Sequence, residues 1–275
     1  MSSRILTEIW IYPIKSLAGI RLPKANVMEK GLQYDRRWML VDEQGRFLTQ
    51  REHPEMALFT ISMMPEGFLI TSQKKNTMGS SILLPFESKS KKKTEKVQIW
   101  DDEVEAAEVD PIYSRWFSES LGIACKLVFF HELNARAVDR GYAKNNEEVS
   151  LADAYPFLII GESSLKKLND KLEQPVGMMR FRPNFVFAGG DAFEEDTWNN
   201  FSIGSVSFYA AKPCSRCILT TVDPETGIKG IEPLRTLSTF RKINSKILFG
   251  QNVLALEHGE VKEGNTINVI DLKIK

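Results

Sequence analysis

The sequence contains few residues that could form disulfides or a histidine-rich metal site. Three cysteines and three histidines occur among 275 residues. An odd number of cysteines in a chain of this size is typical of a reducing compartment, and we therefore expect a cytoplasmic protein without a disulfide framework. A structural zinc site would need a second cysteine pair or histidines at ligand spacing, and the remaining thiol and imidazoles are too scattered to supply them.

Long apolar runs and an excess of charge are also missing. No stretch of about 18 apolar residues occurs, so we expect no membrane span. The N-terminal segment carries charges inside its apolar run and is typical of a strand rather than of a signal peptide. Basic and acidic residues balance at 36 each, which argues against nucleic acid as a partner. The dense basic stretch at residues 89–96 is interpreted as a solvated hairpin loop.

Short strand-like runs bounded by turn residues predict a mostly β fold. Residues 37–41 and 46–49 flank Asp42-Glu43-Gln44-Gly45, a pattern typical of a hairpin. Many short strands at such spacing predict a barrel or a sandwich. The predicted strands cover residues 5–12, 37–41, 46–49, 58–63, 68–71, 82–84, 97–100, 126–130, 185–187, 206–210, 218–222, 253–256 and 266–270.

Three helices are predicted by their start signals and apolar spacing. Asp110 can cap a helix that has Pro111 at its first position and Gly122 as its stop. Two more helices are predicted to begin at Ser163 and at Pro233, each with its apolar side chains on one stripe. We interpret all three as covering a core, because burial alone produces this spacing.

The most distinctive stretch is Cys214-Ser215-Arg216-Cys217, where nearby cations favour thiolate over thiol. The β-branched run at residues 218–222 predicts a reactive loop that feeds a strand. A redox pair of the thioredoxin type normally lies where a strand feeds a helix, so this prediction argues against one. Two unreactive thiols packed in a core remain an alternative, although a serine and an arginine between them are unusual for a core strand.

Three polar motifs elsewhere could contact a ligand. Lys15-Ser16 offers a cation and a hydroxyl at a strand end, as a phosphate requires, although exposed lysines are common at such places. Asp35-Arg36-Arg37, taken alone, is interpreted as a surface ion-pair cluster. In Arg182-Pro183-Asn184 the guanidinium can clamp a phosphate or a pterin carbonyl, and the amide offers a donor and an acceptor together. An arginine that braces two halves of the chain is the alternative.

Taken together, three motifs resemble the MOSC family, and most closely its amidoxime-reducing molybdenum enzymes and bacterial YcbX-type proteins. They are Tyr12-Pro13-Ile14-Lys15-Ser16, Phe181-Arg182-Pro183-Asn184 and the segment at residues 214–224. The resemblance spans residues 5–270. It implies a MOSC-associated β-barrel-like domain at residues 1–130, followed by a MOSC β-barrel domain at residues 131–275 with a few covering helices. The polar stretch at residues 145–148 fits a boundary in this region.

The same resemblance implies a molybdenum cofactor of the molybdopterin type between the two domains. Cys217 would be the catalytic residue and the thiolate ligand of molybdenum, a metal that suits a soft ligand. The implied chemistry is two-electron reduction of a small N-hydroxylated substrate by oxygen-atom removal at molybdenum. The implied cofactor-binding residues are Lys15, Ser16, Arg36, Asp153, Tyr155, Arg182, Asn184, Ser215 and Arg216.

The sequence departs from the YcbX-type proteins, which extend into a ferredoxin-like domain. Three cysteines cannot supply the usual four thiolates of an iron–sulfur cluster, and no Gly-x-Gly-x-x-Gly dinucleotide motif is present. We therefore expect a separate electron-transfer protein as a partner. MOSC domains also resemble the terminal domain of cofactor sulfurases, so a cofactor or sulfur carrier with a persulfide on Cys217 is an alternative. A regulatory binding module without metal is another.

Overall fold

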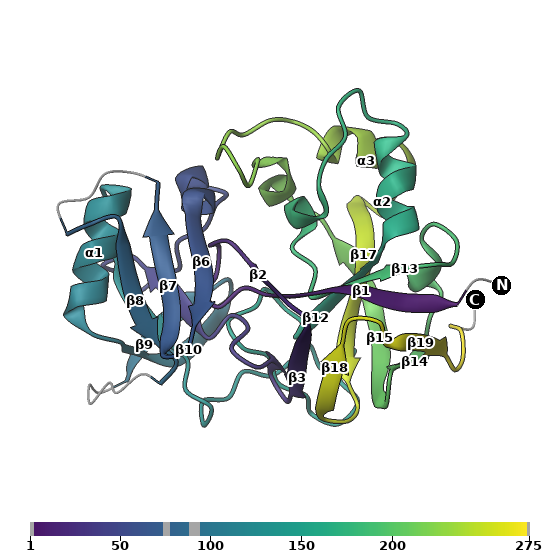
Figure 1. The fold of residues 1–275 in the computed structure, drawn as a ribbon, viewed down its shortest axis with the longest axis horizontal. Helices are drawn as coiled ribbons and strands as arrows, with labels where there is room; N and C mark the ends of the chain where they lie inside the picture. The colour runs from purple at the N-terminus through teal and green to yellow at the C-terminus, as the bar shows by residue number, and fades with distance from the viewer. Residues whose placement is uncertain (1–2, 74–77, 88–93, 274–275) are drawn as a thin grey trace.

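The computed structural model describes residues 3–73, 78–87 and 94–273. Two halves lie side by side, and both ends of the chain lie at the outer side of the second half (Figure 1). The predicted mostly β class is confirmed, because strands far outnumber helices among the described residues. Most of the basic stretch at residues 89–96 falls outside the described residues.

Among the described residues, seven strands close a barrel in the second half. Neighbouring strands are hydrogen-bonded around the ring, and pairing of the two end strands, with Phe157 opposite Val253, closes it. Two short strands outside the ring, β2 (Ile20–Leu22) and β16 (Lys242–Ile243), pair antiparallel with β1 and β17. The ring order is β12 (Phe157–Gly161), β13 (Phe185–Ala188), β1 (Arg4–Ile11), β19 (Thr266–Val269), β14 (Asn200–Ile203), β15 (Val206–Ser215) and β17 (Lys246–Ala255).

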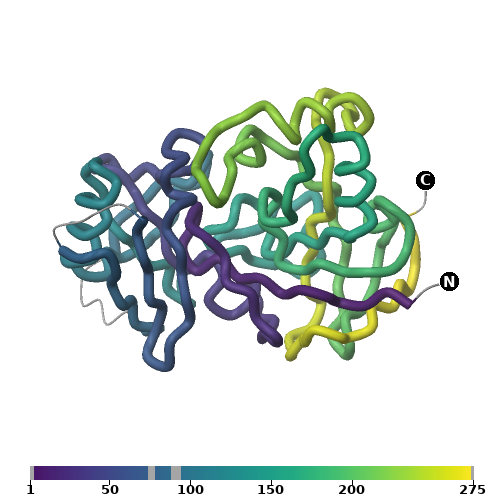
Figure 2. The backbone as a smooth tube through the Cα atoms, turned by 45° about the horizontal axis from the view of Figure 1, so that its top comes forward, coloured from purple at the N-terminus to yellow at the C-terminus, as the bar shows by residue number. Residues whose placement is uncertain are grey.

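The first strand of the chain belongs to this barrel rather than to the first half. β1 pairs antiparallel with β13 and with β19, so that Ile9 lies opposite Phe185 and Arg4 lies opposite Ile267. Figure 2 shows the purple start of the tube running along the second half before the chain crosses to the first. A cut at residue 130 would therefore separate a barrel strand from its neighbours, and the domain division at that residue stays a prediction.

The first half contains two sheets that share a core. Trp38 lies against Phe68 at a ring-centroid distance of 5.7 Å, and Phe59 lies 5.8 Å from Trp116 of the helix that packs beside them. One sheet has the order β5 (Trp38–Val41), β11 (Lys126–Phe129), β10 (Asp102–Glu108) and β9 (Glu95–Ile99). The other has the order β6 (Phe59–Met64), β7 (Gly67–Ser72) and β8 (Ser81–Pro85).

A small third sheet joins the two ends of the chain. Its strands are β18 (Gly259–Lys262), β3 (Lys24–Met28) and β4 (Gly31–Leu32), with β3 in the centre. Since β18 comes from the last part of the chain and β3 from the first, their backbone hydrogen bonds tie the beginning of the first half to the barrel.

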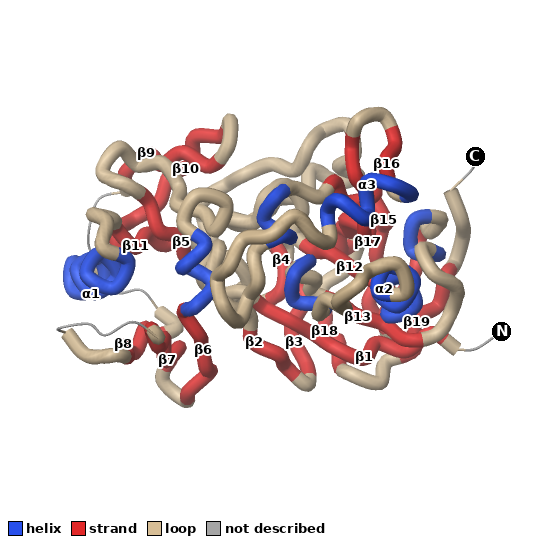
Figure 3. Tube along the Cα trace, turned by 90° about the horizontal axis from the view of Figure 1, so that it is seen from above, coloured by secondary structure: helices blue, strands red, loops and turns tan. Residues whose placement is uncertain are grey.

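Three α-helices occur in the described part of the chain, α1 (Pro111–Leu121), α2 (Glu162–Asn169) and α3 (Leu234–Phe240). The predicted caps of α1 are confirmed: Asp110 accepts a hydrogen bond from the Ile112 amide, and Gly122 ends the helix with a left-handed φ of 75°. Figure 3 shows α1 at the outer end of the first half, and α2 and α3 beside the barrel. No helix of the described residues combines the length and apolarity that a bilayer crossing requires.

The predicted strand at residues 218–222 is wrong. A 3₁₀ helix, Ile218–Thr221, follows Cys217, so a strand feeds a short helix at this place. The hydroxyl of Thr220 donates to the Cys217 carbonyl at 3.0 Å, and the hydroxyl of Thr221 donates to the Ile218 carbonyl at 2.7 Å. These local bonds offer the backbone an alternative to a sheet ladder and outweigh β propensity. Further 3₁₀ turns cover Pro54–Leu58, Met178–Phe181 and Glu194–Asp196.

Candidate functional site

A cleft of about 560 Å³ lies between the two halves. Its lining includes Lys15 and Arg36 from the first half and Cys217 from the second. Segments some 200 residues apart in sequence thus face one cavity, although the cofactor role of each residue stays a prediction. All ten residues expected at a site line this cleft: Lys15, Ser16, Arg36, Asp153, Tyr155, Arg182, Asn184, Ser215, Arg216 and Cys217.

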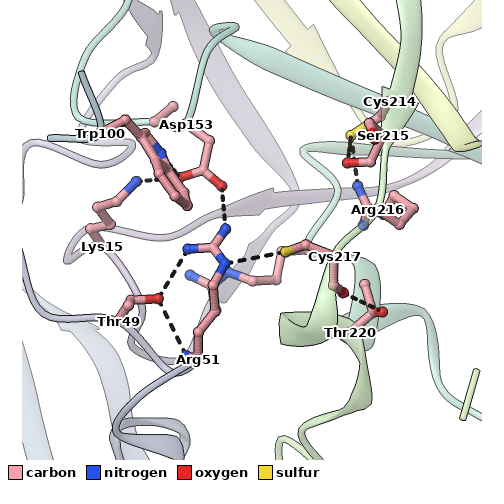
Figure 4. A network of polar contacts seen from close by, with 12 residues as sticks. Lys15, Thr49, Arg51, Trp100, Asp153, Cys214, Ser215, Arg216, Cys217 and Thr220 are labelled. Carbon is pink, nitrogen blue, oxygen red and sulfur yellow. Dashed lines mark hydrogen bonds and ion pairs between the residues drawn. The ribbon is translucent and has the colours of Figure 1, made fainter. Parts of the chain in front are cut away.

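Arg51 joins Cys217 to the opposite wall of the cleft. Its Nε donates to Cys217 Sγ at 3.2 Å, and its Nη2 donates to Asp153 Oδ2 at 3.2 Å (Figure 4). The guanidinium carbon lies 4.3 Å from the ring centroid of Trp100, a cation–π distance. Desolvation alone would lower the pKa of Arg51, but the neighbouring Asp153 carboxylate and Cys217 sulfur raise it, so this guanidinium stays charged beside Cys217.

Asp153 is shared between two cations of the first half. Lys15 Nζ lies 2.5 Å from Asp153 Oδ1 and also donates to the Leu151 carbonyl at 3.0 Å. Although desolvation acts to raise the pKa of Asp153, Lys15 and Arg51 hold it well below its usual range. Burial lowers the pKa of Lys15 to about 8, with Asp153 opposing that shift. The alternative interpretation of Lys15 as an exposed lysine at a strand end is wrong, because Lys15 is only 5% exposed.

Two arginines of the cleft lining enclose the ring of Tyr12. The guanidinium carbons of Arg36 and Arg182 lie 4.2 Å and 4.1 Å from its centroid. Arg36 pairs with Asp35 at 2.6 Å, and Asp35 is 1% exposed, so the interpretation of residues 35–37 as a surface cluster is wrong. Arg182 donates to the Leu17 carbonyl at 2.7 Å, and burial lowers its pKa to about 10.

The amide of Asn184 is already engaged by the protein. Its Oδ1 accepts from the Leu158 amide and from Arg36, each at 3.2 Å, and its Nδ2 donates to the Trp10 carbonyl at 3.1 Å. Asn184 thus fixes the position of Arg36 and leaves one amide N–H for any further partner.

The two cysteines of the motif have different partners. Arg216 Nη1 donates to Cys214 Sγ at 2.8 Å, and its Nη2 donates to the Phe181 carbonyl, whereas Cys217 is contacted by Arg51. The expectation that a strand rather than a helix follows the motif has failed, which removes one argument against a redox pair. The strands beside the motif are nevertheless antiparallel, unlike a βαβ unit.

Backbone strain gathers along the cleft. Ser16, Arg36 and Arg182 have φ values of 68°, 49° and 53°, in the left-handed region that residues with a Cβ seldom adopt. Each such residue costs on the order of 1 kcal/mol and persists only where the surrounding contacts hold it. Clustering of these residues at one cavity is typical of a functional site.

Two models of known domain families match this chain. A model of the MOSC N-terminal beta barrel domain matches residues 3–124, and a model of the MOSC domain matches residues 146–268. The chain belongs to the MOSC-domain family.

Relatives within the MOSC family include two kinds of molybdenum-related protein. Mitochondrial amidoxime-reducing component 1 of Mus musculus is 32% identical over 97% of this chain and 80% of its own length. The Homo sapiens protein of the same name is 31% identical over 96% and 82%. Molybdenum cofactor sulfurase of Oryza sativa subsp. japonica is 30% identical over 94% of this chain but only 33% of its own length.

The residues of the cleft fit a phosphate-bearing pterin cofactor with a metal that accepts a thiolate. Seven cationic side chains but only one carboxylate, that of Asp153, line it within the described residues. Arg216 Nε and the Tyr155 hydroxyl are buried without a hydrogen-bond partner. Buried polar groups normally have partners, so these orphans and the surplus of positive charge suit an anionic ligand rich in acceptors. Cys217 offers a soft ligand at the same cavity.

Sequence reasoning missed Arg51, which lines the cleft, and Trp100, whose ring packs on the Arg51 guanidinium. Arg51 follows a predicted strand within the polar segment Thr49-Gln50-Arg51-Glu52, a signal that could have marked it. Trp100, which donates its indole N–H to Asp153 at 3.2 Å, has a φ of 55° at the turn between β9 and β10, and nothing local in the sequence predicts that conformation.

Proposed function

We propose that this protein binds a molybdenum–pterin cofactor in the cleft and reduces small N-hydroxylated compounds with electrons from a separate electron-transfer protein. The observation that carries the proposal is the position of Cys217 in a cation-rich cleft, held by Arg51 at 3.2 Å. The amidoxime-reducing names of relatives that match along nearly the whole chain support the reaction class.

In this proposal the residues divide into three roles. Cys217 would hold molybdenum, and Arg51 would keep its sulfur facing the cleft. Lys15, Ser16, Arg36, Arg182 and Arg216 would hold the phosphate and the pterin, because they supply cations and hydrogen-bond donors on the walls. Asp153 and Asn184 would position these cations through their contacts to Lys15, Arg51 and Arg36. Tyr155 and Ser215 would offer hydroxyl groups to the ligand.

When bound, the cofactor would supply the two-electron redox chemistry. Reduction of a hydroxylamine to an amine and water takes up two electrons and two protons. The protein's part would be to bind and orient the substrate beside Cys217 and to exclude competing ligands. A cavity with walls from both halves is suited to this task.

The test uses protein from a host with a complete molybdenum-cofactor pathway and from a matched host without it. We expect about stoichiometric molybdenum, and reduction of benzamidoxime by reduced methyl viologen, only in the first preparation. Protein that takes up no molybdenum from the competent host would contradict the proposal at its first step. Loaded protein that reduces no N-hydroxylated compound would contradict the reductase role alone.

The match to molybdenum cofactor sulfurases favours one second candidate, a cofactor or sulfur carrier. Here Cys217 would carry a persulfide, and Arg51 would stabilise the negative charge of its terminal sulfur. Cyanide-labile sulfur on the wild-type protein but not on Cys217→Ala, without benzamidoxime reduction, is the result expected for a carrier. If protein that reduces benzamidoxime contains no cyanide-labile sulfur, the carrier role is excluded.

A further inference from the structure

One end of the cleft contains a lysine that the proposed cofactor contacts do not use. Lys212 lines the cleft near the end of β15. The pairing of β15 with β17 shifts register between Ala210 and Lys212 and again between Pro213 and Ser215. Such irregularities re-aim side chains relative to a regular strand.

The ammonium of Lys212 lies in a corner of two tyrosine rings. Its Nζ is 4.4 Å from the ring centroid of Tyr142 and 5.1 Å from that of Tyr155. The two rings meet edge to face, with centroids 6.3 Å apart at 80°. Asp139 builds the turn that presents Tyr142, since its carbonyl accepts from the Tyr142 amide at 2.9 Å and its Oδ1 accepts from the Gly141 amide at 3.0 Å.

This corner has spare hydrogen-bonding capacity. Lys212 Nζ forms an ion pair with Asp139 at 3.6 Å, which is longer than a hydrogen bond, and the Asp139 side chain is 54% exposed. Among the described residues no acceptor is hydrogen-bonded to the three N–H groups of Lys212. The Tyr155 hydroxyl is also without a partner, although Tyr155 is only 6% exposed. An ammonium over the ring of a tyrosine whose buried hydroxyl is unpaired supplies a charge and a donor of the kind that an oxyanion accepts.

We propose that Lys212 and Tyr155 form a subsite for a carboxylate or phosphate group of the ligand that occupies the cleft. The inference builds on the proposed function, because it makes acid-bearing N-hydroxylated compounds the preferred substrates. Lys212 and Cys217 are five residues apart, at most about 16 Å of extended chain. Both side chains line the same cavity, so a substrate that bears an acid and an N–O group can meet both. The phosphate of the cofactor is the second possible source of the same chemistry.

The first experiment measures binding without turnover. Benzoate and inorganic phosphate are titrated into the purified protein by calorimetry. We expect the Lys212→Met variant to bind at least one of them about ten-fold more weakly, and Tyr155→Phe a few-fold more weakly, because charge-assisted hydrogen bonds are lost. Lys246→Met is the matched control, since it removes the same charge from another lysine of the cleft lining, and it should change the affinity about two-fold or less. Lys212→Arg should restore most of the binding.

Two further measurements identify the source of the anion. If the anion is the substrate's acid, Lys212→Met keeps its molybdenum content, and its KM rises about ten-fold for 4-carboxybenzamidoxime but not for benzamidoxime, with kcat unchanged. If it is the cofactor phosphate, molybdenum content falls several-fold instead. Equal binding of both probes by the wild type and Lys212→Met overturns the subsite. Because the titration needs no turnover, that result is distinct from failure of the proposed reductase.

Discussion

Glu195 is the carboxylate whose burial makes the sharpest prediction about stability. It is fully buried in the 3₁₀ turn Glu194–Asp196, where the Ser164 hydroxyl contacts its two oxygens at 2.8 Å and 3.0 Å. Burial raises its pKa from 4.5 to about 7, with the Ser164 hydroxyl opposing the shift. The folded chain therefore binds a proton here at pH values where the unfolded chain has released it.

The sign of the pH dependence follows from this difference. The protonated carboxyl favours the folded state, so its contribution is complete below pH 4.5 and is lost as the pH rises through about 7. At about 1.4 kcal/mol per pKa unit, the shift corresponds to about 3 kcal/mol. Glu195→Gln replaces the acid with an amide that stays neutral, so the variant should become more stable relative to wild type by about this amount between pH 5 and pH 8.

Urea unfolding followed by circular dichroism at several pH values measures this difference. Glu173→Gln is the control, because it makes the same substitution at a side chain exposed on the surface. A difference between Glu195→Gln and wild type that stays level with pH would show that the folded protein holds Glu195 as an ordinary carboxylate. The reasoning from burial would then be refuted.

The remaining predictions concern the cleft. Cys217→Ala should abolish molybdenum retention while Cys214→Ala keeps most of it, measured as metal per chain, and the reverse order would move the ligand to Cys214. Arg51→Met should lower the free energy of unfolding by about 3 kcal/mol, because it removes charge-assisted contacts to Cys217 and Asp153. The same variant should retain less metal per chain. Unchanged metal content would show that Arg51 does not help to hold the cofactor. Fragments 1–130 and 131–275 should each fail to retain cofactor, because β1 of the first fragment is a barrel strand of the second; cofactor on either fragment alone would refute a shared cleft.

Local patterns were sufficient for elements whose stabilising contacts are local. The α1 helix begins after Asp110 and ends before Gly122 as predicted, because both caps act within one turn. The strand predicted at residues 5–12 is β1, but its place in the barrel depends on pairing with β13, about 180 residues away. Alternation of apolar residues predicts that a strand exists and leaves its partner open.

The failures have equally physical causes. Residues 218–222 are β-branched, yet the threonine hydroxyls bond to carbonyls three residues earlier and stabilise a 3₁₀ turn. β12 was missed because all five of its residues, Phe157–Gly161, are buried, so no alternation marks it. Arg51 was missed because its partners Cys217 and Asp153 lie 166 and 102 residues away. The prediction that these residues share one cleft rested on the resemblance of their motifs to a family, because the periodicity of the sequence carries no information about it.

The strained backbone at Ser16 allows its structural role to be tested separately from a role in binding the cofactor. Its φ of 68° disfavours any residue with a Cβ, its carbonyl accepts from Gln50 at 2.6 Å, and its hydroxyl has no hydrogen bond within the described residues. Ser16→Gly should therefore be about 1 kcal/mol more stable than Ser16→Ala, the opposite of the usual preference for alanine. Both variants lose the hydroxyl, so both should lose molybdenum content equally if that hydroxyl contacts the cofactor. Wild-type metal content in both variants would limit the role of Ser16 to its backbone, since the Gln50 contact remains available in each.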